Sequence, residues 1–155
     1  MIKRSAVFNK EKTKRFLLSR SWKNNRYSKS CVFIMLNPSK ADDIIDDRTI
    51  KKCMFYSVKF GFQKMDVINL FPNILTKPDF KKLSFCNQNF LIIKKTLKKA
   101  DTVYLAWGYN IKIASWLYPL LEKKNVFALE LSKNNTPKHP LYLKRQLKPL
   151  RMTIT

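Results

Sequence analysis

The sequence predicts a three-layer α/β sandwich with a central, mainly parallel four-stranded sheet and an N-terminal β extension. Four short apolar runs, each rich in β-branched or aromatic residues and bounded by polar or turn residues, are typical of buried strands. Segments with the apolar spacing of helices lie between these runs. Such alternation indicates a parallel sheet covered by helices. The length of 155 residues, without a linker or repeat, predicts a single domain over residues 1–155.

The expected elements follow in chain order. AVF (6–8) and RFLLSRSW (15–22) predict an N-terminal antiparallel pair or an added edge of the sheet. The core strands are expected at CVFIML (31–36), MDVINLF (65–71), TVYLAW (102–107) and NVFALEL (125–131). Helices are expected over residues 46–60, 87–99 and 109–124, where apolar side chains recur on one face.

The charge of the chain favours a polyanionic partner. The sequence has 32 Lys and Arg against 10 Asp and Glu, a formal net charge of +22, and 13% of its residues are aromatic. We therefore expect DNA, single- or double-stranded, as the partner, together with other DNA-processing proteins. Composition alone leaves two alternatives open: an AT-rich genome enriches Lys, Asn and Ile without selection for binding, and an anionic membrane surface also attracts basic proteins.

Several classes of site are excluded by the residues that the chain lacks. Gly61 and Gly108 are the two glycines, so neither a P-loop nor a dinucleotide-binding fingerprint can be written. The single histidine and three dispersed cysteines fit neither a metal site nor a disulfide framework, and we expect no metal and no cofactor. There is no apolar run long enough for a membrane span and no apolar core of a signal peptide. We expect a cytoplasmic monomer that binds no membrane.

Polar residues follow the predicted core strands where each one ends. Asn37 follows the first strand, Asn69 lies near the end of the second, Gly108 follows the third, and Lys138-His139-Pro140 comes shortly after the fourth. Because ligands of open parallel sheets bind at the carboxyl ends of the strands, we expect these residues around one cleft. Each also has a structural interpretation: Asn37 begins a turn, Asn69 satisfies backbone groups, and His139 is an ordinary loop residue.

The motifs MLNPS, VINLF, YLAWG and KHPLYL resemble those of an uncharacterised family of bacterial, phage and mobile-element proteins, over residues 6–145. Members carry LNPS-x-AD, D-x-TI, VNLF, AWG and HPLYL in this order. More remotely, the same order resembles the uracil-DNA glycosylase superfamily. There, a water-activating motif such as G-I-N-P-G follows the first strand, an asparagine ends the second, and H-P-S-P follows the fourth.

The superfamily resemblance implies a base hydrolase that flips a nucleotide out of the DNA stack. It implies that Asn37 orients the attacking water, that Asn69 reads a base edge, and that His139 donates to the departing base. Pro38, Ser39 and Thr49 would line the base pocket.

This sequence departs from the superfamily pattern in several places. Ser39 and Met35 replace glycines of the first motif, Thr49 or Ile50 stands where a phenylalanine stacks on the base, and Leu141 replaces the phosphate-binding serine. These departures argue against uracil as the base.

Basic residues on both sides of the motifs are the candidate phosphate contacts. Arg26 lies among aromatic residues in SRSWKNNRYSK (19–29), where stacking on bases is also open. Lys138, Lys144, Arg145 and Lys148 surround or follow His139. In the superfamily this last region enters the minor groove with an apolar wedge, which Leu141 or Leu143 would supply.

Four aspartates lie within six positions, in ADDIIDD (41–47), and three interpretations stay open. Asp46 and Asp47 would cap the helix that follows. The cluster would otherwise hold a magnesium ion, or Asp42 or Asp47 would act in catalysis or base recognition. Two functions therefore compete: a DNA-binding base hydrolase acting on uracil or a modified base, and a non-catalytic DNA-binding or interaction module with the same fold. An enzyme acting on a free modified nucleotide is a third.

Overall fold

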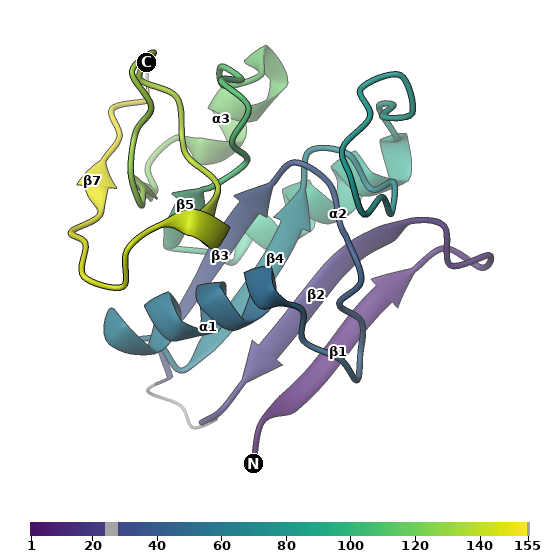
Figure 1. Ribbon diagram of the computed structural model, residues 1–155, viewed down its shortest axis with the longest axis horizontal. Helices are drawn as coiled ribbons and strands as arrows, with labels where there is room; N and C mark the ends of the chain where they lie inside the picture. Colours follow the sequence, from purple (N-terminus) through teal and green to yellow (C-terminus); the bar gives the residue numbers. More distant parts are fainter. Residues whose placement is uncertain (24–27, 155) are drawn as a thin grey trace.

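The computed structural model describes residues 1–23 and 28–154 (Figure 1). Its seven strands are β1 Lys3–Phe8, β2 Arg15–Ser21, β3 Ser30–Met35, β4 Lys64–Asn69, β5 Thr102–Leu105, β6 Asn125–Ala128 and β7 Leu150–Arg151. Its helices are α1 Arg48–Lys59, α2 Asn87–Lys98 and α3 Tyr118–Leu121, with the 3₁₀ turns η1 Ser115–Leu117 and η2 Pro140–Tyr142. The α/β class is therefore confirmed. Within the described residues, no helix is long and apolar enough to cross a membrane.

The sheet is mixed and has seven strands in the order β1-β2-β4-β3-β5-β6-β7. The four expected core strands are parallel to one another and lie side by side. The expected N-terminal antiparallel pair is confirmed as β1 and β2, which extend the edge of the sheet antiparallel to β4. The prediction of a four-stranded sheet is nevertheless wrong, because these two strands and β7, antiparallel to β6, belong to the same sheet. β7 has two residues, which is too short for any alternation of apolar and polar residues to reveal it.

Helices cover both faces of the sheet (Figure 1). On one face, Ile50, Cys53 and Tyr56 of α1 pack against strand residues such as Phe33 and Tyr104, whose rings stack 5.0 Å apart. On the other face, α2, η1 and α3 bury Ile93, Leu97, Leu117 and Leu121 against the opposite side chains of the same strands. Because β3 is buried on both faces, its sequence is almost continuously apolar.

The prediction of a helix over residues 109–124 holds only for residues 115–121, which form η1 and α3. Tyr109 and Asn110 have left-handed backbone angles, with φ of 59° and 53°, so a helix cannot begin there. Tyr118, before Pro119, keeps helical angles (φ −51°, ψ −51°), whereas Glu122 has a ψ of 138° and Lys123 has a φ of 64°, which ends the helix. Leu117 and Leu121 are buried all the same, which explains the helix-like spacing.

Candidate functional site

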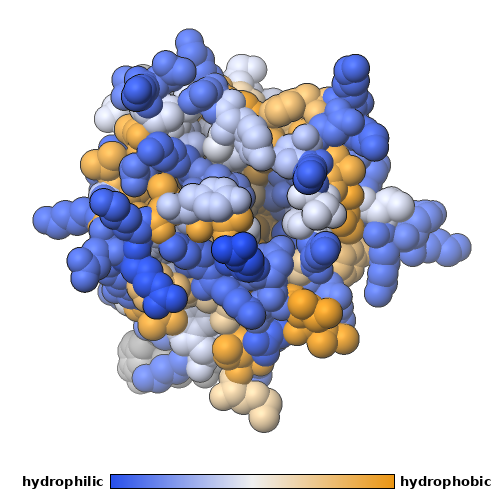
Figure 2. All heavy atoms as spheres, in the orientation of Figure 1, coloured by the Kyte–Doolittle hydropathy of each residue, from blue (hydrophilic) through white to orange (hydrophobic). Residues whose placement is uncertain are grey.

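A cleft of about 1000 Å³ opens at the carboxyl ends of the core strands. Its walls come from the loop after β3, the N-terminus of α1, the segment 75–78, the loop after β5, and residues 132–143 including η2, which surround the middle of the view in Figure 1. Figure 2 shows that hydrophilic side chains dominate this face, with smaller apolar areas between them. Residues from distant parts of the sequence therefore meet here, as the strand-end argument predicts.

Half of the twelve sequence-predicted site residues line this cleft. Those in its lining are Asn37, Ser39, Thr49, Lys138, His139 and Leu141, together with Gly108. Pro38 and Asn69 are buried outside the lining. Lys144, Arg145 and Lys148 are exposed and lie outside the lining, and Arg26 lies outside the described residues.

Asn37 faces the cleft with an acceptor. Its Nδ2 donates to the carbonyl oxygens of Pro38 at 3.1 Å and Leu75 at 3.2 Å, which fixes the orientation of the carboxamide. Within the described residues, no group donates to Oδ1. This half-buried side chain therefore joins two loops and can accept a hydrogen bond from a water or a ligand.

His139 faces the same cleft with a donor. Its Nδ1 accepts a hydrogen bond from the backbone N–H of Leu141 at 3.2 Å, so a neutral ring carries its proton on Nε2. Burial lowers the pKa of His139 below 6.5, although the charge of Asp47 opposes this. Gly108 lets the loop after β5 pass close by, because a Cβ there would lie 3.1 Å from the Cβ of His139 and φ is +74°.

Asn69 lies in a buried polar cluster away from the cleft lining. Its Oδ1 accepts a long hydrogen bond of 3.5 Å from Nη2 of Arg15, and its backbone oxygen accepts one from Asn89. Arg15 Nε, Asn69 Nδ2 and Asn89 Oδ1 are buried with no hydrogen-bond partner within the described residues. The interpretation of Asn69 as a group that satisfies backbone atoms is therefore wrong: within the described residues its side chain bonds only to Arg15, and Asn89 is the side chain that satisfies a backbone oxygen.

The aspartates organise the cleft wall. Asp47 caps α1 by accepting from the N–H of Ile50 at 2.8 Å. Asp42 accepts from the N–H groups of Ile45 and Ile44, and these bonds lower its pKa. No cluster of three or more His, Cys, Asp or Glu that could hold a metal occurs in the described part of the chain. The helix start is thus confirmed for Asp47.

Asp46 belongs to an ion-pair network that sequence reasoning missed. Its carboxylate pairs with Arg20 at 2.6 Å and Arg4 at 2.7 Å. Burial alone would raise the pKa of Asp46, but the hydrogen bonds from Arg4 and Arg20 outweigh it and lower the pKa. Arg20 is fully buried and also donates to four backbone carbonyls, so it fixes the loop 42–46 to the N-terminal hairpin. The available signal was an arginine on the apolar face of a strand, after Phe16 and Leu18.

The charges in the cleft favour an anionic ligand. Five basic side chains line it, from Lys40, Arg48, Lys51, Lys77 and Lys138, against the two carboxylates of Asp46 and Asp47. Both carboxylates are engaged, by the two arginines and by the α1 cap. Lys138 is itself paired with Glu130 at 2.7 Å.

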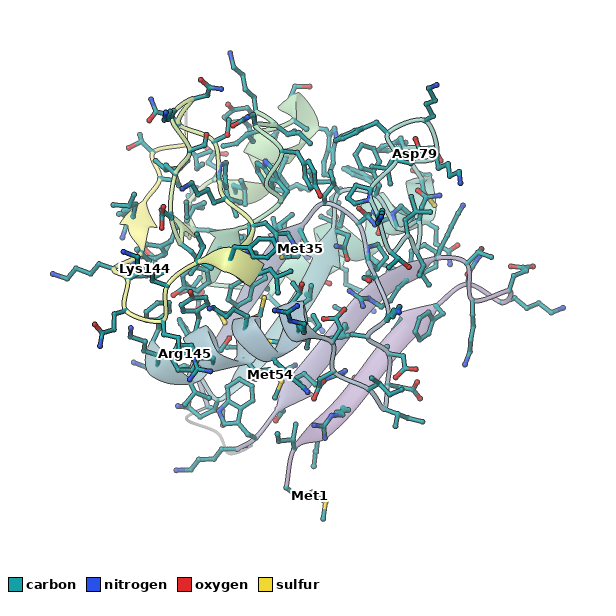
Figure 3. All side chains as sticks on the ribbon, in the orientation of Figure 1. Met1, Met35, Met54, Asp79, Lys144 and Arg145 are labelled. Atoms are coloured by element: carbon teal, nitrogen blue, oxygen red, sulfur yellow. The ribbon has the colours of Figure 1, made fainter. Side chains whose placement is uncertain are left out.

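A strap of residues 143–145 lies along α1 beside the cleft. Lys52, Tyr56 and Lys59 donate to the carbonyl oxygens of Leu143, Lys144 and Arg145, respectively. Lys144 and Arg145 of the strap are exposed, the Arg145 guanidinium lies 5.0 Å from the centre of the Phe55 ring of α1, and both residues are labelled in Figure 3.

The side chains of the loop that follows His139 differ in exposure. Leu143 is 8% exposed and cannot serve as a wedge in this conformation, which corrects that alternative. Leu141 is half-buried in the cleft lining. The projecting side chain of this loop is Tyr142, 85% exposed.

Comparison with known proteins confirms the expectation that this chain belongs to an uncharacterised family. No curated protein and no solved structure matches the chain. A family model described as a protein of unknown function, DUF1643, matches residues 15–141, which include β2 to β6 and nearly all of the cleft lining. This chain belongs to the family DUF1643.

Proposed function

We propose that this protein binds DNA with the basic rim of the cleft, admits one unpaired base, and hydrolyses the bond between that base and its sugar. The observation that carries the proposal is the convergence of Asn37 and His139, which lie far apart in the sequence, on one cleft with complementary free groups. Its volume is at the upper end of the roughly 300–1000 Å³ of small-molecule sites, enough for a nucleotide.

The chemistry needs an oriented water and a donor to the leaving base. N-glycosidic hydrolysis passes through an oxocarbenium-like state, in which the base gains negative charge. Oδ1 of Asn37 accepts from the attacking water and orients it, and Nε2–H of His139 donates to the base atom that gains charge. The lowered pKa of His139 keeps the ring neutral at pH 7, so Nε2–H acts as a hydrogen-bond donor.

The basic residues supply the contact with the phosphates. Lys40, Arg48, Lys51 and Lys77 lie in the cleft lining, and Lys144, Arg145 and Lys148 extend the charge along the neighbouring surface. The motif order that resembles the uracil-DNA glycosylase superfamily supports the same function. Ser39 and Thr49 lie in the lining, where the base would be held, and the departures from the superfamily motifs at Ser39, Thr49 and Leu141 favour a modified base over uracil.

A second candidate function is a non-catalytic DNA-binding or interaction module. It is favoured by the hydrogen bonds of Asn37, because its Nδ2 joins the carbonyls of two loops and explains the residue without any reaction. This function predicts DNA binding without base release.

Release of the base tests the proposal. Wild type should form abasic sites in at least one oligonucleotide of a panel containing uracil, hypoxanthine or modified bases. Asn37→Ala and His139→Ala should each lower the rate by about 100-fold or more, the scale of losing one preorganised donor or acceptor. Asn134→Ala, at an exposed asparagine outside the cleft, is the control and should keep the wild-type rate. If wild type binds DNA but releases a base from no oligonucleotide, the non-catalytic function remains. Base release by a variant that carries both Asn37→Ala and His139→Ala would contradict the assignment of the reaction to this cleft.

A further inference from the structure

Two exposed aromatic rings meet at the rim of the cleft on the side away from the strap. Phe80, between β4 and α2, and Tyr109, after β5, are each 54% exposed. Their ring centroids are 6.0 Å apart and the ring planes are at 78°, an edge-to-face contact. Tyr109 also lines the cleft. Figure 3 labels Asp79, next to Phe80, on the opposite side of the view from Lys144 and Arg145.

The turn that carries Tyr109 has an unusual backbone conformation and is held by hydrogen bonds on both sides. Gly108, Tyr109 and Asn110 have consecutive positive φ angles of 74°, 59° and 53°, a region that side chains with a Cβ rarely adopt. Bonds on both sides hold this turn: Gly108 N–H donates to Pro137 at 3.0 Å, and Trp107 Nε1 donates to Ile111 at 2.7 Å. Unfavourable backbone conformations of this kind concentrate at functional sites. Here the result is a tyrosine ring presented at the cleft mouth on a fixed turn.

The surroundings of the two rings are basic. The exposed lysines in the two segments are Lys77, Lys81, Lys82 and Lys112. The acidic residue among them is Asp79, whose carboxylate accepts from the backbone N–H of Lys81 and so closes a turn. Exposed aromatic rings combined with lysines are the features that bind unpaired bases and their phosphates.

We propose that Phe80 and Tyr109 form a second base-binding site, where the neighbour of the base held in the cleft stacks, and that the protein therefore takes single-stranded DNA in preference to a closed duplex. Bases in a duplex stack on one another and cannot also stack on these rings unless the duplex opens. This inference rests on the proposed DNA binding and adds a substrate class to it.

The test compares an oligodeoxythymidylate of about 12 nucleotides with an oligonucleotide of equal length made of abasic units, which keeps the phosphates and removes the bases. Affinities are measured by fluorescence anisotropy at about 50 mM salt. Wild type should prefer the base-containing strand, and Tyr109→Ala or Phe80→Ala should lower this preference by about 5-fold or more. Tyr109→Phe, which keeps the ring, should retain it. Phe85→Ala is the matched control, because Phe85 is 59% exposed and its ring packs against Phe90 and Trp116, away from the Phe80–Tyr109 pair.

The outcomes separate this inference from the proposed function. Equal affinity of wild type for the two strands, or tighter binding of a duplex of the same sequence, would overturn the second base site while leaving DNA binding intact. No binding of any of these DNAs would contradict the proposed function itself. Loss of the preference in Phe85→Ala as large as in Phe80→Ala would also overturn the site, because the effect would then not depend on the cleft rim.

Discussion

Two arginines of β2, five residues apart, are buried in very different ways. Arg20 is fully buried, pairs with Asp46 at 2.6 Å and donates to four carbonyls. Arg15 is 3% exposed and has no ion pair within the described residues. It donates to Ala41 at 2.8 Å and to Asn69 at 3.5 Å, and its Nε has no partner there. Burial lowers the pKa of Arg15 to about 10, against the opposing charge of Asp47.

The two arginines differ in how completely their burial is compensated: Arg20 is fully paired, whereas Arg15 is incompletely paired and its burial is costly. A buried charge stabilises a fold only when its hydrogen bonds and its counter-charge are complete. The Arg20 network meets that condition and holds the cleft wall, whereas the Arg15 cluster leaves polar atoms unpaired behind the loops that form the cleft. The same substitution should therefore change the free energy of unfolding by different amounts at Arg20 and at Arg15.

The largest expected effect is that of Arg20→Met. It leaves the mostly buried carboxylate of Asp46 with Arg4 alone and should lower the free energy of unfolding by about 3–5 kcal/mol. Arg15→Met is the matched comparison and should cost about 1–2 kcal/mol, since it removes a poorly paired charge along with one good hydrogen bond. Urea denaturation measures both. Equal losses would contradict the distinction between the two arginines.

Acid should reveal the same network. Because the folded-state pKa of Asp46 lies below 3.8, its ion pairs contribute stability that is present above pH 3.8 and is lost as the pH falls through the folded-state pKa. The free energy of unfolding of wild type should therefore drop in that range. Arg20→Met should lose less in the same range, because one of the two partner charges of Asp46 has gone. Arg15→Met should follow the wild-type curve, and a flattened curve for Arg15→Met would count against this account.

The smallest effect concerns the cap of α1. Asp47→Ala removes the acceptor for the N–H of Ile50 and should cost about 1 kcal/mol, measured by thermal or urea unfolding. Asp47→Ser keeps a capping oxygen and should cost less. Asp43→Ala, at an exposed aspartate of the same loop, is the control and should change stability within about 0.5 kcal/mol. If Asp43→Ala matched Asp47→Ala, the loss would be one of charge and not of the cap.

Local patterns predicted the elements whose burial is regular. β3 was expected because it is apolar throughout, and α1 and α2 were expected within about two residues of their ends because one face of each is buried. The helix expected over 109–124 is limited to 115–121 because the positive φ angles of Tyr109, Asn110 and Lys123 interrupt a spacing that is otherwise helical. β7 was missed because its two residues have no pattern of their own.

The candidate site was predictable where topology alone brings residues together. Asn37 and His139 follow parallel strands, so the carboxyl ends of those strands carry them to one edge of the sheet. The pairing of Arg20 with Asp46 joins residues 26 positions apart and could not be deduced from local spacing. Asn69 shares its strand end with the others, but its side chain contacts Arg15 from an antiparallel strand that the four-stranded prediction left outside the core.

The central claim is that DNA binds at the cleft and is not held by net charge alone. The most direct test removes two lysines in each of two places: Lys51→Ala with Lys77→Ala in the cleft lining, and Lys94→Ala with Lys98→Ala on the exposed side of α2. Both variants lose the same charge. We expect the cleft variant to bind a single-stranded oligonucleotide more weakly and to lower the log-log salt slope by about 1.4, while the α2 variant stays close to wild type. Equal losses of affinity and slope in the two variants would contradict the claim.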